Sequence, residues 1–178
     1  MRRLEIPDMD AFFARLDAHI SRQHDAPAMK FTLVAVGGTS LTLRDWKLST
    51  KDVDFMVADA DHERVKRWAR AAAPDIKADL WAETHIFSTT LPGDYETERF
   101  ASFRNFDVTL LSAIDVAATK IGRLSEADAE DIRTIIIKGV KKEHIIARAE
   151  QILAAGGYAN AEAAREKIKT FKAIAKDW

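Results

Sequence analysis

The chain has 178 residues and a mass of 19.9 kDa, a size typical of one domain or of a domain with a helical extension. Hydrophobic residues make up 47%, enough for a core without cross-links, and the absence of cysteine excludes disulfide scaffolds, zinc–thiolate sites and thiol catalysis. The formal net charge of −1 excludes a uniformly basic nucleic-acid-binding protein. No apolar stretch approaches the roughly 18 residues of a membrane span, so we expect a soluble cytoplasmic protein.

Helices and strands are predicted to alternate through the first 111 residues. A helix is expected over residues 8–24, where apolar residues recur at helical spacing: Met9, Phe12, Phe13, Leu16 and Ile20. The elements then expected are a strand and tight turn at 30–38, a short helix at 39–46, a strand at 49–57 and a helix at 61–73. Further strands are expected at 75–82, 85–91 and 103–111, with a loop or hairpin connection at 91–99.

From residue 112 onward the pattern is helical. Ser112 and Ser125 each precede an aspartate by three residues, the S-x-x-D pattern of a capping box, and so predict two helix starts. A third helix is expected over 142–155, before two glycines, and a fourth after Asn160. These patterns predict an α/β (α+β) fold with a mixed sheet and flanking helices in residues 1–112. Residues 113–178 are expected to form a helical region packed on that core as one unit.

The segment from residue 37 to residue 54 combines groups that suit phosphate and metal chemistry. Glycines allow the backbone to approach a phosphate closely, and hydroxyls and helix-start amides can bind its oxygens, as at Gly37, Gly38, Thr39 and Ser40. Asp52 and Asp54 are two residues apart on a predicted strand, so both carboxylates should lie on one face. Such a pair favours a divalent cation such as Mg²⁺, which also binds substrate phosphates. The segment therefore predicts phosphoryl-transfer chemistry.

A third carboxylate would complete a two-metal site, and two residues compete for that position. Asp79 lies on the strand predicted after the next helix, and it is a metal ligand if that strand neighbours the strand of Asp54. Asp107, on the last predicted strand, is the alternative. Either could take the proton from an attacking hydroxyl.

The order G-G-T-S, D-V-D-F and a later strand aspartate resembles the DNA polymerase β-type nucleotidyltransferase superfamily. By that resemblance, Gly37, Gly38 and Ser40 bind the triphosphate of an incoming nucleotide. Asp52, Asp54 and Asp79 are implied to hold two Mg²⁺ ions.

A second region, TKIGRLSEADAEDI at 119–132, is similar to a helical region of small prokaryotic nucleotidyltransferase-like proteins. These include the toxins of AbiEii-type toxin–antitoxin systems and the related MenT-type toxins. The resemblance implies that Lys120 and Asp131 belong to the active site and to nucleotide binding. The residues themselves leave another interpretation open, in which Lys120 and Arg123 form ordinary ion pairs with Asp115 or Asp128.

Three functions follow as hypotheses. The first is a Mg²⁺-dependent nucleotidyltransferase that moves a nucleotidyl group from a nucleoside triphosphate to a hydroxyl of RNA, such as tRNA, or of a protein, with a toxin–antitoxin role and an antitoxin partner. The second is a catalytically inactive interaction module with the same fold. The third is a nucleic-acid-binding protein that uses the basic residues of 138–178.

Overall fold

The computed structural model describes residues 3–178, which form two compact units. One unit consists of the chain up to Glu83 together with Thr97–Leu110, and the other consists of Thr84–Glu96 and Leu111–Trp178. The sequence alone places residues 84–96 before the boundary at 112, whereas their contacts group them with the C-terminal helices.

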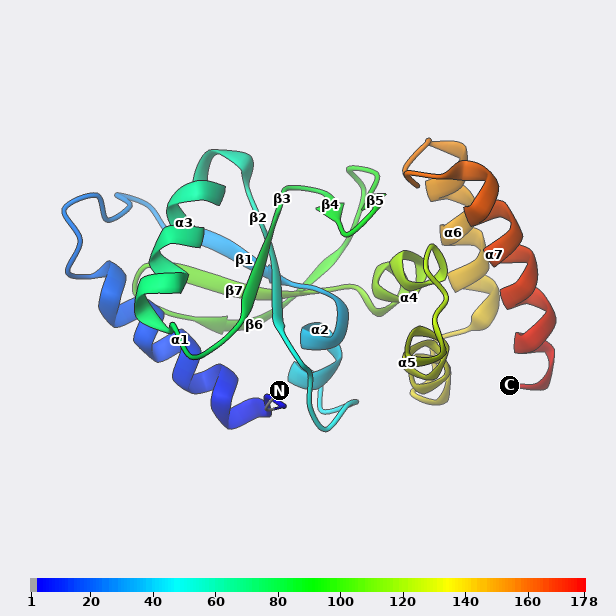
Figure 1. The fold of residues 1–178 in the computed structure, drawn as a ribbon, viewed down its shortest axis with the longest axis horizontal. Helices are drawn as coiled ribbons and strands as arrows, with labels where there is room; N and C mark the ends of the chain where they lie inside the picture. The colour runs from blue at the N-terminus through cyan, green and yellow to red at the C-terminus, as the bar shows by residue number, and fades with distance from the viewer. Residues whose placement is uncertain (1–2) are drawn as a thin grey trace. The chain divides into compact units, whose positions relative to one another are not determined.

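The first unit is built around a five-stranded mixed sheet with the strand order β3-β2-β1-β7-β6 (Figure 1). The strands are β1 (Phe31–Ala35), β2 (Val53–Val57), β3 (Ala78–Ala82), β6 (Thr97–Ser102) and β7 (Phe106–Leu111). β2 runs antiparallel to β1, while β3 is parallel to β2 and β7 is parallel to β1. The predicted α/β fold with a mixed sheet is confirmed.

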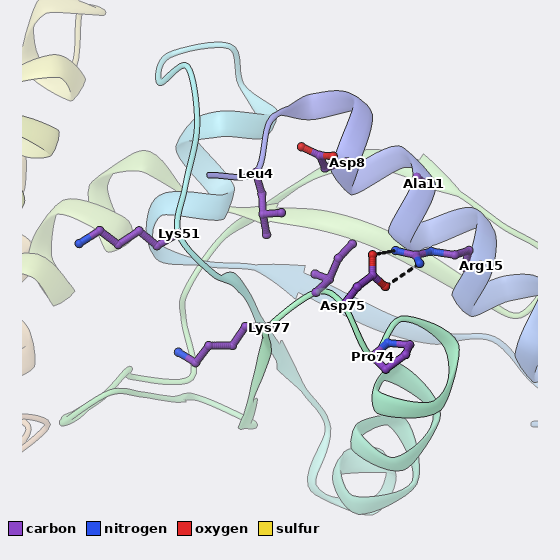
Figure 2. Close-up of a pocket in the computed structure, with 9 residues that line it drawn as sticks. Leu4, Asp8, Ala11, Arg15, Lys51, Pro74, Asp75 and Lys77 are labelled. Carbon is purple, nitrogen blue, oxygen red and sulfur yellow. Dashed lines mark hydrogen bonds and ion pairs between the residues drawn. The ribbon is translucent and has the colours of Figure 1, made fainter. Parts of the chain in front are cut away.

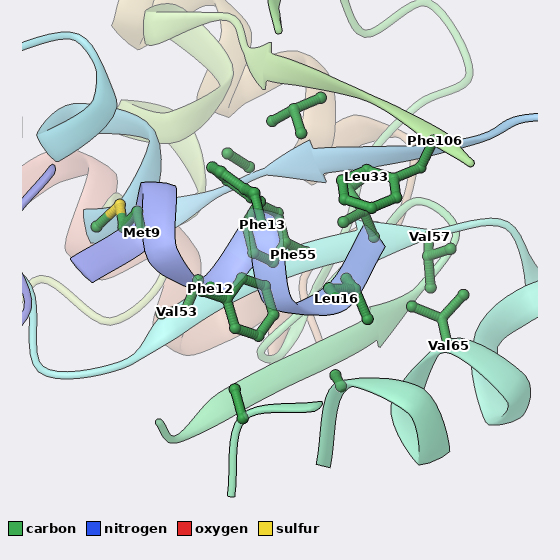
Figure 3. Packing of buried hydrophobic residues seen from close by; sticks show 14 of the residues in the cluster. Met9, Phe12, Phe13, Leu16, Leu33, Val53, Phe55, Val57, Val65 and Phe106 are labelled. Carbon is green, nitrogen blue, oxygen red and sulfur yellow. The ribbon is translucent and has the colours of Figure 1, made fainter. Parts of the chain in front are cut away.

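Two helices, α1 (Ile6–Ile20) and α3 (Asp59–Ala72), pack against one face of this sheet. The five apolar residues predicted from the helical spacing of 8–24 are the buried residues of α1. They meet alternate residues of the strands, such as Val53, Phe55 and Val57 of β2, in a core rich in phenylalanine (Figure 3). Because strand side chains alternate between faces, Asp54 and Met56 must point to the opposite face of the sheet. The short helix α2 (Gly37–Leu43) joins β1 to β2.

The second unit contains α4 (Ala113–Ile121), α5 (Glu126–Ile137), α6 (Lys142–Ala154) and α7 (Ala161–Ile174), followed by a short 3-10 turn (Ala175–Asp177). The predicted caps are confirmed: the side chains of Ser112, Ser125 and Asn160 each accept a hydrogen bond from a backbone N–H in the first turn of their helix. A small hairpin of β4 (His85–Ile86) and β5 (Thr89–Thr90) belongs to this unit.

Three local predictions are wrong. Residues 85–91 are the hairpin of β4 and β5 rather than one strand, because Phe87 has a φ of 56° and turns the chain. Residues 97–102, expected to be partly loop and not a strand, form the edge strand β6, which is exposed and therefore lacks the apolar alternation of a half-buried strand. β2 begins at Val53 and not at residue 49, since Thr50 instead pairs through its backbone with Leu4. Asp52 therefore precedes the strand.

Candidate active site

The glycine pair forms the turn from β1 into α2, and the helix begins at Gly37, two residues before the earliest predicted start. Gly37 has a φ of 54°, a left-handed conformation that favours glycine. Gly38 lies against the loop before β2, because a Cβ atom at this position would be 2.7 Å from Thr50 Oγ1 and 3.9 Å from Lys47 Nζ. The turn therefore requires glycine at both positions. It also brings the ammonium of Lys47 close to the backbone of Gly38.

Thr39 links this turn to the acidic strand. Its hydroxyl oxygen accepts a hydrogen bond from the backbone N–H of Asp54 at 2.8 Å and donates to the backbone oxygen of Asp52 at 3.3 Å. Thr39 is fully buried. Its side chain thus fixes the position of both aspartates relative to α2, and a nucleotide-binding role for Thr39 stays a prediction.

Asp79 lies directly beside Asp54. The two residues are register partners in the parallel pair β2–β3, so their side chains lie on the same face of the sheet. Asp54 is only 7% exposed. The pKa of Asp54 is raised to about 6. Burial is the main cause, and the negative charges of Asp79 and, to a smaller extent, Asp52 add to it. The three predicted acids therefore form one negatively charged cluster within the first unit.

Asp107 occupies the other end of the sheet. It pairs in register with Thr32 of β1, whereas Asp54 meets β1 at Val36, four residues further along, a separation of about 13 Å. A hydrogen bond from Ser102, assisted by Lys30, holds the pKa of Asp107 below its usual value. Asp79, and not Asp107, is thus the neighbour of the acidic pair, although its role as a ligand is still a prediction.

A lysine that sequence reasoning missed stands between two of the acids. Lys77 Nζ is 3.1 Å from Asp52 Oδ1 and 2.7 Å from Asp79 Oδ2, and these two carboxylates raise the pKa of Lys77. The sequence did contain a signal for this contact. Side chains two positions apart on a strand lie on the same face, so Lys77 is expected on the same side as Asp79.

A second missed cation, Arg44, lies at the end of α2. Its guanidinium donates to the hydroxyl and the backbone oxygen of Ser40 and forms an ion pair with Glu98 of β6 at 3.2 Å. Burial lowers the pKa of Arg44, an effect that Glu98 opposes. This contact could have been expected from the sequence, because residues four positions apart, such as Ser40 and Arg44, lie on the same face of a helix.

Lys120 and Asp131 come together in the second unit. Lys120 Nζ is 3.2 Å from Asp128 Oδ1 and 2.7 Å from Asp131 Oδ2, and all three side chains are buried. Arg123 also binds Asp128, at 2.8 Å, and stacks over the ring of Phe87. Burial alone would raise the pKa of Asp128, but Lys120, Ser125 and Arg123 hold it below its usual value. The interpretation as ion pairs with Asp128 is therefore confirmed, while Asp115 pairs with Arg148.

The acidic cluster of Asp52, Asp54 and Asp79 suits a hard cation. The three carboxylates are close enough to interact electrostatically, but neither they nor any other three acidic or histidine side chains among residues 3–178 are arranged as a preformed set of ligands for one metal ion. Mg²⁺ does not require such a cage, since it is usually bound by one or two carboxylates together with substrate phosphates and water. The donors are all oxygen atoms, and the pKa of Asp54 is raised first by its burial and then by the neighbouring carboxylates, which outweigh the opposing effect of Lys77. The residues present therefore fit Mg²⁺.

A comparison with protein-family models gives a match over residues 11–175, to a family described as a nucleotidyltransferase of unknown function, DUF6036. The chain belongs to this family. The matched residues include both the glycine turn and the acidic cluster, the two features from which the sequence predicts nucleotidyl transfer. No curated protein sequence matches the chain. In the part of the chain that the structure describes, no helix has the length and apolar character needed to cross a membrane.

Proposed function

We propose that this member of the family is a Mg²⁺-dependent enzyme that transfers a nucleotidyl group from a nucleoside triphosphate to a hydroxyl of RNA or protein. The observation that carries the proposal is the register of β2 and β3, which sets Asp79 beside Asp54, while Thr39 holds the glycine turn against the same strand. The glycine turn, to which the proposal assigns phosphate binding, and the three carboxylates thus belong to the same part of the first unit.

Each group in this arrangement has a defined task in the proposed reaction. The backbone of Gly37 and Gly38 approaches the triphosphate, and Lys47, which lies close to Gly38, adds positive charge there. Asp52, Asp54 and Asp79 would hold Mg²⁺, which when bound neutralises the charge that develops on the phosphate oxygens. The acceptor oxygen forms a bond to the α-phosphorus as the bond to pyrophosphate breaks, and Asp79, which is partly exposed, accepts the proton of the hydroxyl.

Lys120 and Asp131 belong to the proposal through the resemblance to AbiEii- and MenT-type toxins. Their buried ion pairs give both side chains a structural role within the second unit. A part in nucleotide binding would require the Lys120 ammonium to exchange a carboxylate for a phosphate oxygen. The same resemblance extends the proposal to a toxin–antitoxin pair, in which expression of the wild type, but not of Asp54→Asn, stops bacterial growth.

The test uses each of the four nucleoside triphosphates labelled at the α-phosphate, with Mg²⁺ and with total RNA or cell extract as the acceptor. The wild type should transfer label to an acceptor. Asp54→Asn and Asp52→Asn should lower the rate by at least about a hundredfold, the effect expected when a group that stabilises transition-state charge is removed. Asp107→Asn is the matched control, because its carboxylate lies at the other end of the sheet, and it should retain activity.

Two results would contradict the proposal. Transfer that survives Asp54→Asn would place the chemistry elsewhere. Failure of the wild type to bind any nucleotide would favour the alternative, a catalytically inactive interaction module with this fold.

A further inference from the structure

Lys77 is the cation nearest to the proposed metal ligands, and it contacts two of them at once. Its ammonium lies 3.1 Å from Asp52 and 2.7 Å from Asp79, so it neutralises part of a cluster that holds three carboxylates. The ammonium contacts carboxylate oxygens that a divalent cation would also use, so the two cations would compete for them.

The Lys77 side chain is free to leave this position. It is 51% exposed, and the two carboxylates that it contacts are 26% and 38% exposed. Ion pairs between exposed groups contribute little stability, so a divalent cation can replace them at a small cost.

Open space also adjoins the stem of Lys77. A pocket of about 750 Å³ lies between the start of α1 and the start of β3, with Leu4 and Ile76 in its wall and the ion pair of Arg15 and Asp75 beside it (Figure 2). Figure 2 shows Lys77 at the rim of this pocket, with its side chain extended away from Arg15. The lysine can therefore change rotamer without disturbing the core.

We propose that Lys77 is a built-in competitor of the divalent cation: its ammonium occupies Asp52 and Asp79 in the metal-free protein and must leave when the cation binds. Lys77 is then a positioning residue that sets the cation concentration at which the site fills. This inference rests on the proposed function, because it assumes that the same carboxylates bind the metal.

The test measures Mn²⁺ binding to the full chain, without nucleotide, by calorimetry and by the electron paramagnetic resonance signal of free Mn²⁺. Lys77→Met should bind Mn²⁺ about three- to tenfold more tightly than the wild type, as expected when two exposed ion pairs no longer compete. Lys77→Arg, which retains the charge, should bind with nearly the affinity of the wild type. Thermal unfolding of each variant establishes that it is folded.

Lys51→Met is the matched control. Lys51 immediately precedes Asp52 and is exposed, yet among residues 3–178 it forms no ion pair with the acidic cluster. Its removal changes the net charge as much as Lys77→Met does, but it should alter the Mn²⁺ affinity by less than about twofold, as expected for a screened surface charge.

The outcomes separate this inference from the proposed function. If Lys77→Met binds no more tightly than the wild type, or if Lys51→Met gains as much affinity, direct competition is overturned, while loss of Mn²⁺ binding in Asp54→Asn would still support the metal site. If no variant and no wild-type protein binds Mn²⁺ at millimolar concentration, both the competition and the metal-dependent function are overturned.

Discussion

Asp54 lies in an environment unlike that of an ordinary surface aspartate, because it is nearly buried and two other carboxylates are close to it. Its burial, together with the carboxylates of Asp79 and Asp52, raises its pKa from 3.8 to about 6. The folded protein therefore binds this proton more tightly than the unfolded chain does. Where the folded state binds more protons, stability falls as the pH rises, so the metal-free protein should lose stability between about pH 4 and pH 6.

Asp54→Asn should remove this pH dependence. The difference in free energy of unfolding between the variant and the wild type should be near zero at pH 4 and should favour the variant by about 2–3 kcal/mol at pH 7, which corresponds to a pKa raised from 3.8 to about 6. Urea unfolding in the presence of EDTA at pH 4, 5.5 and 7 measures it. Asp107→Asn is the control, since the pKa of Asp107 is lowered and its removal should bring no gain with rising pH. If the difference in free energy of unfolding between Asp54→Asn and the wild type does not change with pH, the pKa of Asp54 is not raised in the folded protein.

At the scale of elements, the position of α2 depends on a close approach rather than on helix propensity. α2 has only seven residues, and two of them are glycines, which are poor helix formers. What holds it is the contact of Gly38 with the loop before β2 and the hydrogen bonds of Thr39 with that strand. The distance between the glycine turn and the acids is thus set by packing between α2 and β2.

Gly38→Ala should disturb this packing. A methyl group would lie 2.7 Å from Thr50 Oγ1, and the backbone of Thr50 is itself tied to Leu4 through two hydrogen bonds, so either the Thr50 side chain must rotate or α2 must shift. We expect a loss of about 1–2 kcal/mol of stability, as for other overpacked sites, and weaker binding of nucleoside triphosphate. Gly93→Ala serves as the control, because a Cβ at that position meets no atom within 4 Å. Chemical denaturation and nucleotide titration of both variants give the two values, and equal stability of the two would refute the close approach.

At the scale of the whole molecule, the chain passes from the first unit into the second at residue 84 and returns at residue 97. Residues 84–96 are held to the C-terminal helical region by a main-chain hydrogen bond, which Thr90 N donates to Gly157 O at 2.6 Å. Arg148 of α6 adds an ion pair with Asp94 at 2.8 Å and another with Asp115. The buried Tyr158 donates its hydroxyl hydrogen to the backbone oxygen of Ala118, and burial raises the pKa of this phenol.

Gly157→Ala should weaken the contact between residues 84–96 and the C-terminal helices. The added Cβ would lie 2.3 Å from the backbone oxygen of Thr90 and 2.8 Å from the side chain of Ile152, and neither can move without breaking other contacts. We expect a loss of about 2–4 kcal/mol, with faster amide hydrogen exchange confined to residues 84–96 and the adjoining helix ends. Gly93→Ala, within the same segment, should leave exchange unchanged. Uniform exchange in Gly157→Ala would argue against this role of the contact.

Local features of the sequence were enough to predict the helix caps, the apolar face of α1 and the nearness of a glycine turn to two aspartates. Those features act between residues a few positions apart, where hydrogen bonds and periodicity decide the outcome. The partner of Asp54 could not be predicted in this way, because the choice between Asp79 and Asp107 depends on strand order and register. The contact of Lys77 with Asp52, the edge strand β6 and the grouping of residues 84–96 with the helices likewise arise from pairing between distant segments. Only the tertiary structure decides them, since the burial and hydrogen bonds that favour one pairing over another exist only once the chain has folded.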